Sequence, residues 1–178
     1  MRTGILGGSG LYELEGLEHT EWVEVETPFG APSDRLLTGT LGGAEIAFLP
    51  RHGRGHRLLP SEINHRANLF AMKTLGVERV LSVSAVGSLR EELRPGDFLL
   101  PDQYFDRTKA SERHTFFGHG VVAHVPFGHP VCGVWADAVE SACRHAVAED
   151  DVRVVRGGTY VNMEGPAFST LAESEFHR

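Results

Sequence analysis

Short apolar segments alternate along this sequence with segments of helical periodicity, and this alternation restricts the fold more than any other feature. Apolar or alternating segments that suit β-strands occur near residues 4–6, 20–26, 35–40, 44–50, 79–84, 98–101 and 152–163. Helical spacing is found in residues 61–76 and 131–146, and Ser61 is predicted to cap the first of these helices. Gly42-Gly43 predicts a hairpin, which adds antiparallel pairs to strands otherwise connected by helices. We therefore predict an α/β fold with a mixed central β-sheet flanked by helices.

The second half of the chain is less regular. Residues 107–120 are polar and rich in histidine, which predicts a long loop, and residues 121–125 predict a further strand. Thr170 and Glu173 match a capping box, so a helix should begin there. Only about two helical turns follow before residue 178. We expect a single domain over residues 1–178 whose C-terminal part is missing.

Composition excludes several classes of function. No run of about 18 apolar residues is present, which argues against a membrane span. The N-terminus lacks the pattern of a signal peptide, so we expect a cytoplasmic protein. The formal net charge of −7 disfavours a nucleic-acid partner. The two cysteines, Cys132 and Cys143, do not suggest a disulfide framework or a metal site.

Three segments that suit an anion follow three of the expected strands. Residues 7–10 read Gly-Gly-Ser-Gly, where the backbone can approach a ligand closely and Ser9 can donate a hydrogen bond. Arg51 and His52 begin the basic segment RHGRGHR of an otherwise acidic chain. Residues 84–88 are small and include the hydroxyl of Ser84. Strand ends commonly line ligand sites in α/β folds, although a tight turn or a solvated basic patch would explain each segment alone.

Other known motifs do not fit these segments. Residues 7–10 lack the spacing of a dinucleotide fingerprint, a Walker A loop or a nucleophile elbow. His52 and His56 have the spacing of a zinc-binding pair, but the glycines between them disfavour the required helix. We therefore expect no metal. Phe168 and Ser169 could stack on a base and hydrogen-bond to it, unless Phe168 is simply part of the core.

Five segments, taken in order, resemble one enzyme family. They are GILGGSGLY, TPFGAPSD, RHGRGHRLLPSEINHRAN, SVSAVGSLREELRPGDFLLPDQYFDRT and NMEGPAFSTLAES. Together they resemble the methylthioadenosine phosphorylase branch of the trimeric purine nucleoside phosphorylases. The resemblance extends over nearly the whole chain, and family members continue well beyond a residue like Arg178. Leu171 departs from the pattern, because the family often has Arg at that position.

The resemblance implies a role for individual residues. By matching position, the phosphate-binding set is Ser9, Arg51, His52, Ser84 and the backbone of Ala85. Phe168 would pack on the purine and Ser169 would lie near its edge, with His56 and His124 on the 5′ side of the sugar. The catalytic group that protonates the purine is an Asp or Asn that the family carries beyond the region matched by residues 1–178.

The implied reaction is phosphorolysis of S-methyl-5′-thioadenosine, with inorganic phosphate as co-substrate and no cofactor. The family also implies a homotrimer. Related enzymes that prefer 6-oxopurines such as inosine or guanosine, or methylthioinosine, share much of this sequence and remain an alternative. A nucleosidase would use water and would not need Arg51 and His52. A non-catalytic module that binds phosphate or a nucleoside is a further alternative, but it leaves Phe168 and Ser169 unexplained.

Overall fold

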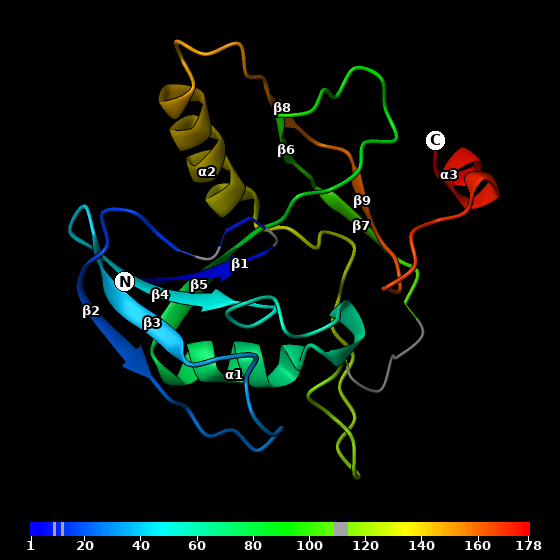
Figure 1. Cartoon of the computed structure of the whole chain (residues 1–178). Helices are drawn as coiled ribbons and strands as arrows, with labels where there is room; N and C mark the ends of the chain where they lie inside the picture. The colour runs from blue at the N-terminus through cyan, green and yellow to red at the C-terminus, as the bar shows by residue number, and fades with distance from the viewer. Residues whose placement is uncertain (9, 12, 109–113) are drawn as a thin grey trace. The chain divides into compact units, whose positions relative to one another are not determined.

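The structure is a computed structural model that describes residues 1–8, 10–11, 13–108 and 114–178 (Figure 1). It divides into two compact units. The first comprises Met1–Val86 with Ala110–Gly118, and the second comprises Gly87–Lys109 with His119–Arg178. Each is described separately below, and a single domain over residues 1–178 stays a prediction.

A five-stranded mixed sheet forms the centre of the first unit, in the order β2-β3-β4-β1-β5. Its strands are β1 (Arg2–Gly7), β2 (Glu18–Val23), β3 (Leu36–Leu41), β4 (Ala44–Pro50) and β5 (Val77–Val83). Strand β1 runs parallel to both β4 and β5, while β3 is antiparallel to β2 and β4. The predicted hairpin is confirmed: Gly42 and Gly43 have φ of 54° and 81°, values that favour glycine.

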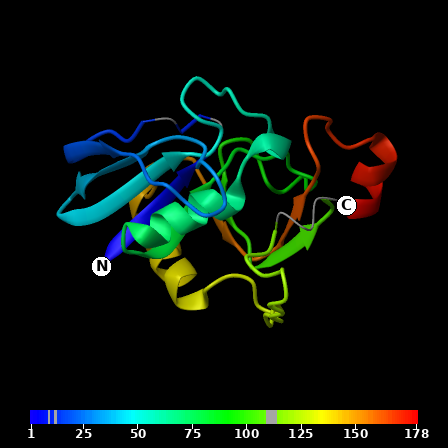
Figure 2. The same cartoon turned by 90° about the horizontal axis from the view of Figure 1, so that it is seen from below.

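From Ile46 to Pro50 both faces of β4 are buried, which explains why this part of the strand is apolar without interruption. On one face, Ala47 and Leu49 pack with Ala71 and Met72 of α1 (His65–Thr74). Figures 1 and 2 both show α1 alongside this sheet. On the other face, Phe48 is 0% exposed and packs in a cluster completed by leucines of residues 11–17. Burying both faces holds β4, and the loop that follows it, in one position.

Helix α1 begins later than the sequence predicts. Ser61 lies in a short 3-10 helix, Pro60–Glu62, rather than at the cap of α1. The cap is Asn64, whose side-chain oxygen accepts a hydrogen bond from the backbone N–H of Ala67 at 3.1 Å. Asn and Ser are both favoured caps, so sequence preference alone could not choose between them.

In the described residues of the second unit there are two parallel strand pairs and two helices. Strand β6 (Phe98–Leu100) pairs with β8 (Val154–Arg156), and β7 (Gln103–Asp106) pairs with β9 (Thr159–Asn162). Helix α2 (Gly133–Ala146) provides the predicted helical stripe. Helix α3 (Leu171–His177) begins at the predicted capping box, with Thr170 and Glu173 satisfying each other's backbone N–H groups.

The strand predicted at residues 121–125 is wrong. Only a single β-bridge at Val121 is formed there. Val122 is 80% exposed, so the segment has no buried apolar face to hold it against a sheet. The α/β class with a central mixed sheet is nevertheless confirmed. Among the described residues, no helix has both the length and the apolar character needed to cross a membrane.

A nearly buried carboxylate connects the strands of the second unit to the preceding loop. The Asp97 side chain is 4% exposed and accepts hydrogen bonds from Arg153 Nε at 3.0 Å and from the Arg94 backbone N–H at 2.9 Å. The Arg153 guanidinium also donates to the carbonyl of Glu92. The hydrogen bonds from Arg153, followed by those from Arg94, hold the pKa of Asp97 far below its ordinary value.

Replacing Asp97 should therefore change how the free energy of unfolding depends on pH. A carboxyl with a depressed pKa contributes stability above its unfolded pKa of about 4 and loses it as the pH falls further. We expect Asp97→Asn to lower the free energy of unfolding at pH 7 and to flatten its decline below about pH 4. Urea unfolding at several pH values measures this. Asp151→Asn, which removes an exposed carboxylate paired with the same Arg94, is the control; an equal effect there would exclude a special role for Asp97.

Candidate anion-binding site

Three strands of the first unit end side by side. In the parallel register, Gly7 of β1 pairs with Pro50 of β4 on one side and with Val83 of β5 on the other. The residues that follow these ends therefore emerge at the same edge of the sheet. They are Gly8, Arg51 and Ser84, one from each of the three segments that the sequence singled out. Parallel pairing thus brings together residues far apart in the chain.

Hydrogen bonds lock the three strand ends together. The backbone N–H of Arg51 donates to the carbonyl of Gly7 at 3.0 Å, and that of Gly8 donates to the carbonyl of Val83 at 2.8 Å. Arg51 Nη1 donates to Ser84 Oγ at 2.5 Å. A guanidinium and a hydroxyl in contact at the carboxyl ends of parallel strands form an arrangement that suits a tetrahedral oxyanion such as phosphate.

His52 is buried beside this cluster, with only 4% of the residue exposed. Its Nδ1 lies 2.9 Å from the carbonyl of Leu58, and since a carbonyl only accepts, Nδ1 carries the hydrogen. Burial lowers the pKa of His52 below its ordinary value; the hydrogen bond to Leu58 opposes this, while Arg51 and His56 lower the pKa further. The His56 ring stacks on that of His52 with centroids 4.4 Å apart.

His65 is a further candidate that the sequence did not single out. It is the first residue of α1. Desolvation of its ring lowers the pKa of His65, and the positive charges of His114, Arg51 and His52 lower it further, although the residue as a whole is exposed. This proximity to Arg51 and His52 comes from the fold. No spacing rule in the sequence connects a histidine at a helix start with a strand end elsewhere in the chain.

The remaining predicted residues divide between the two units. His56 and Ala85 are exposed residues of the first unit, whereas Ser9 lies outside the described residues. Phe168, Ser169 and His124 belong to the second unit. The Phe168 residue is 98% exposed, and Ser169 Oγ lies 2.8 Å from Ser174 Oγ of α3. His124 is exposed. Phe168 is therefore not part of the core within the described chain.

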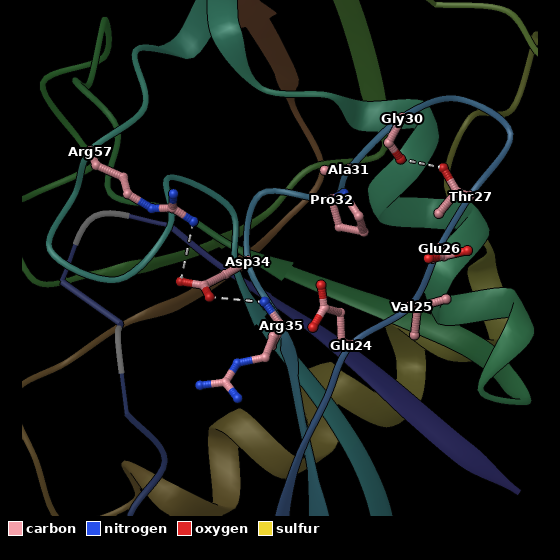
Figure 3. Close-up of a pocket in the computed structure, with 10 residues that line it drawn as sticks. All are labelled: Glu24, Val25, Glu26, Thr27, Gly30, Ala31, Pro32, Asp34, Arg35 and Arg57. Atoms are coloured by element: carbon pink, nitrogen blue, oxygen red, sulfur yellow. Dashed lines mark hydrogen bonds and ion pairs between the residues drawn. The ribbon is translucent and has the colours of Figure 1, made fainter.

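A cavity of about 440 Å³ also lies in the first unit, lined by residues of the segment 24–35 and by Arg57 (Figure 3). Its charged lining has the carboxylates of Glu24, Glu26 and Asp34 and the guanidinium groups of Arg35 and Arg57. The carboxylates outnumber the guanidinium groups, which disfavours an anion, and neither Arg51 nor Ser84 lines this cavity. We therefore assign the anion site to the strand ends. Within the described ranges, no cluster of three or more His, Cys, Asp or Glu side chains is suited to a metal ion.

The chain is similar to known phosphorylases in sequence. A family model described as the phosphorylase superfamily matches residues 2–178. An S-methyl-5′-thioadenosine phosphorylase of Geobacter sulfurreducens is 58% identical over 175 residues, which cover 98% of this chain and 60% of that protein. One from Rhodospirillum rubrum is 55% identical over 98% of this chain and 58% of that protein. The chain thus spans about three-fifths of the length of these curated relatives.

Solved structures agree with this similarity. A methylthioadenosine phosphorylase from an antarctic soil metagenomic library has a TM-score of 0.89 and 48% identity, over 98% of this chain and 60% of that one. The methylthioadenosine phosphorylase of Schistosoma mansoni in complex with adenine has a TM-score of 0.87 and 35% identity, over 99% of this chain and 70% of that one.

The close approach at Gly8 gives a test of the site. A Cβ at Gly8 would lie 2.7 Å from both Arg51 Nη1 and the carbonyl oxygen of Val83, so alanine must displace the guanidinium or the strand ends. We expect Gly8→Ala to cost about 1–3 kcal/mol of stability by overpacking and to reduce the rise in melting temperature caused by phosphate. Gly128→Ala is the control, because a Cβ there meets no atom within 4 Å. Equal phosphate stabilisation of both variants would contradict the assignment.

Proposed function

Because this chain belongs to the phosphorylase superfamily, we propose that the protein containing it cleaves S-methyl-5′-thioadenosine with inorganic phosphate, giving adenine and 5-methylthioribose 1-phosphate. One observation carries the proposal: Arg51 and Ser84 are in contact where β4 and β5 end on either side of β1. An enzyme that used water in place of phosphate would have no need of this cationic clamp.

Phosphate is held in this proposal by the charged and polar groups of the strand ends. Arg51 supplies a planar fork of donors, and Ser84 and Ser9 supply hydroxyls. The Ala85 backbone N–H and the His52 ring complete the set. Because Arg51 is already hydrogen-bonded to Ser84 and lies against Gly8, its guanidinium is oriented before the ligand arrives. Such preorganisation lowers the cost of binding and of catalysis.

The nucleoside side of the site is assigned to residues at the end of the chain and to two histidines. Phe168 offers an exposed ring that a purine could cover by stacking. Ser169, the next residue, is assigned to the edge of the base. His56 and His124 are assigned to the 5′ side of the sugar. These assignments rest on the family resemblance, which the segments EGPAFST and RHGRGHR carry for Phe168, Ser169 and His56.

The reaction exchanges one bond at C1′ for another. The bond from C1′ to the purine nitrogen breaks and its electron pair goes to the base, which takes up a proton. A phosphate oxygen then forms the new bond to C1′, which has passed through a state with oxocarbenium character. The contribution of Arg51, His52 and Ser84 is to position the phosphate and stabilise its charge. We assign no residue of this chain to protonate the purine.

Other features of the whole protein are proposed on the same family grounds. Phosphate is a co-substrate, and neither a metal nor an organic cofactor has a role in the proposed reaction. The protein is proposed to act as a cytoplasmic homotrimer on small molecules, without a nucleic-acid or membrane partner. The net charge of −7 over the 178 residues of this chain supports the lack of a nucleic-acid partner.

Removing the Arg51 guanidinium should affect phosphate far more than nucleoside. Losing a charged hydrogen-bond partner costs about 1.5–3 kcal/mol, or about ten- to a hundredfold in binding. We expect Arg51→Ala in the full-length protein to raise the phosphate KM by that factor and the nucleoside KM much less. Arg144→Ala, which removes a surface arginine paired with Glu140 on α2, should leave both constants unchanged. An unaltered phosphate KM in Arg51→Ala would remove this residue from the site.

The substrate should be a 6-aminopurine nucleoside with a methylthio group. We expect kcat/KM for S-methyl-5′-thioadenosine to exceed that for inosine by about tenfold or more, since a site that hydrogen-bonds one purine edge discriminates against the other. Initial rates with both nucleosides at saturating phosphate measure this ratio. A preference for inosine would indicate the 6-oxopurine branch. A cleavage rate that is the same with and without phosphate would indicate a nucleosidase.

A further inference from the structure

Asp34 is a nearly buried carboxylate just before β3, outside the strand-end cluster. Its side chain is 5% exposed and accepts three hydrogen bonds from Arg54: from the backbone N–H at 2.8 Å, from Nε at 3.1 Å and from Nη2 at 3.0 Å. The Arg35 backbone N–H donates a fourth at 2.9 Å, and the Arg57 guanidinium lies 3.8 Å away (Figure 3). One carboxylate therefore binds both the backbone and the side chain of Arg54.

These bonds reach into the loop that carries Arg51 and His52. Arg54 lies two residues after His52, and its guanidinium also sits over the Trp22 ring of β2, 4.2 Å from the centroid. The loop backbone takes left-handed φ values at Gly53, Gly55 and, unusually for a residue with a side chain, at His56, where φ is 53°. Such a conformation persists only where its surroundings impose it. The bonds from Asp34 to Arg54 provide one such restraint.

The segment that carries Asp34 is hydrogen-bonded to α1. The preceding residue, Ser33, is 3% exposed; its N–H donates to Asn68 Oδ1 at 2.8 Å, and its Oγ accepts from Asn68 Nδ2 at 3.0 Å. The Asn64 side chain donates to the carbonyl of Phe29 at 2.7 Å in the same segment. A continuous set of hydrogen bonds therefore connects α1, residues 29–34 and the loop of Arg54.

We propose that Asp34 is a positioning residue for the phosphate site: through Arg54 it holds the loop in the conformation that presents Arg51 and His52 to the anion. This inference rests on the function proposed above. The negative charge of Asp34 disfavours an anion bound nearby. Asp34 can therefore support phosphate binding only by holding the loop in the right conformation. Burial opposes ionisation of Asp34, but the hydrogen bonds from Arg54 and Arg35 outweigh it and hold the pKa of Asp34 below its ordinary value.

The conflict between charge and geometry makes Asp34→Asn a decisive variant. If Asp34 acted only through its charge, removing that charge would lower the phosphate KM. If it only stabilised the fold, the variant would have less active protein and a lower apparent kcat, with the phosphate KM unchanged. A positioning role predicts a phosphate KM raised by about tenfold, because small displacements of binding groups are costly, with a smaller change in the nucleoside KM.

The experiment uses the full-length protein and two further variants. Glu45→Gln, the control, removes an exposed carboxylate of β4 that pairs with Arg2 at 3.0 Å. It should leave both constants unchanged. Arg54→Gln removes the side-chain half of the contact and leaves Asp34 its backbone hydrogen bonds, so it serves if Asp34→Asn does not fold. The two substitutions combined should raise the phosphate KM no more than the larger single effect, since both break one contact.

The outcomes separate this inference from the proposed function. An unchanged or lower phosphate KM in both Asp34→Asn and Arg54→Gln, or additive effects in the double variant, would overturn the positioning role. Absence of phosphate-dependent cleavage in the unsubstituted protein would instead overturn the proposed function. In that case calorimetric titration with inorganic phosphate replaces the KM. Weaker phosphate binding by Asp34→Asn but not by Glu45→Gln would still support the positioning role.

Discussion

The parallel pairing of β1 with β4 and β5 is the constraint on which the site depends. Because Gly7, Pro50 and Val83 lie in one register, the chain leaves three strands at one level of the sheet. A shift of one residue in any of these strands would turn its side chains to the opposite face. The apolar residues on both faces of β4 make that shift costly, so core packing also determines where Arg51 stands.

The loop after β4 shows how a polar segment can be made rigid without a core of its own. Its first residues are bound to the ends of β1 and β5, its middle to Asp34 and Trp22, and Arg57 in its later part to the carbonyl of Ser33. Further hydrogen bonds join the backbone of the loop to the carbonyls of Pro50, His52 and Gly53. The partners outside the loop come from separate parts of the first unit. The order of the loop therefore depends on the packing of both the sheet and α1. Substitutions that loosen the core should increase the mobility of the loop before they unfold the unit.

Sequence patterns predicted what depends on local chemistry. The hairpin at Gly42-Gly43, the capping box at Thr170 and the strands at residues 44–50 and 79–84 follow from turn preferences, capping and apolar runs, and the structure contains all of them. The segments of Arg51 and Ser84 were found because basic or small residues follow apolar runs. The contact between Arg51 and Ser84 depends on the order of the strands in the sheet, which the periodicity of the sequence does not determine. The strand at residues 121–125 fails for a related reason, because alternation alone does not supply a partner.

The spacing of residue types in the sequence does not reveal residues that act by positioning other residues. Asp34 ends TPFGAPSD, one of the five segments that carry the family resemblance, but neither its residue type nor its spacing indicates that its side chain is buried. Only the structure shows that it is buried against Arg54. His65 is similar, because its proximity to Arg51 depends on where α1 begins. Single residues of this kind become visible only once the strand order and the helix position are known.

The hydrogen bond from His52 Nδ1 to Leu58 has a consequence for proton balance. With that hydrogen committed, the neutral ring has only the lone pair of Nε2 left for a ligand. An oxyanion facing Nε2 must then either carry a proton of its own or meet a ring that has gained one. The dianion HPO4²⁻ has such a proton on its hydroxyl and can donate it to Nε2 without taking up a proton from solvent. A phosphate dianion therefore suits a neutral His52, whereas an oxyanion with no hydroxyl, such as sulfate, requires a protonated ring, which the lowered pKa of His52 opposes.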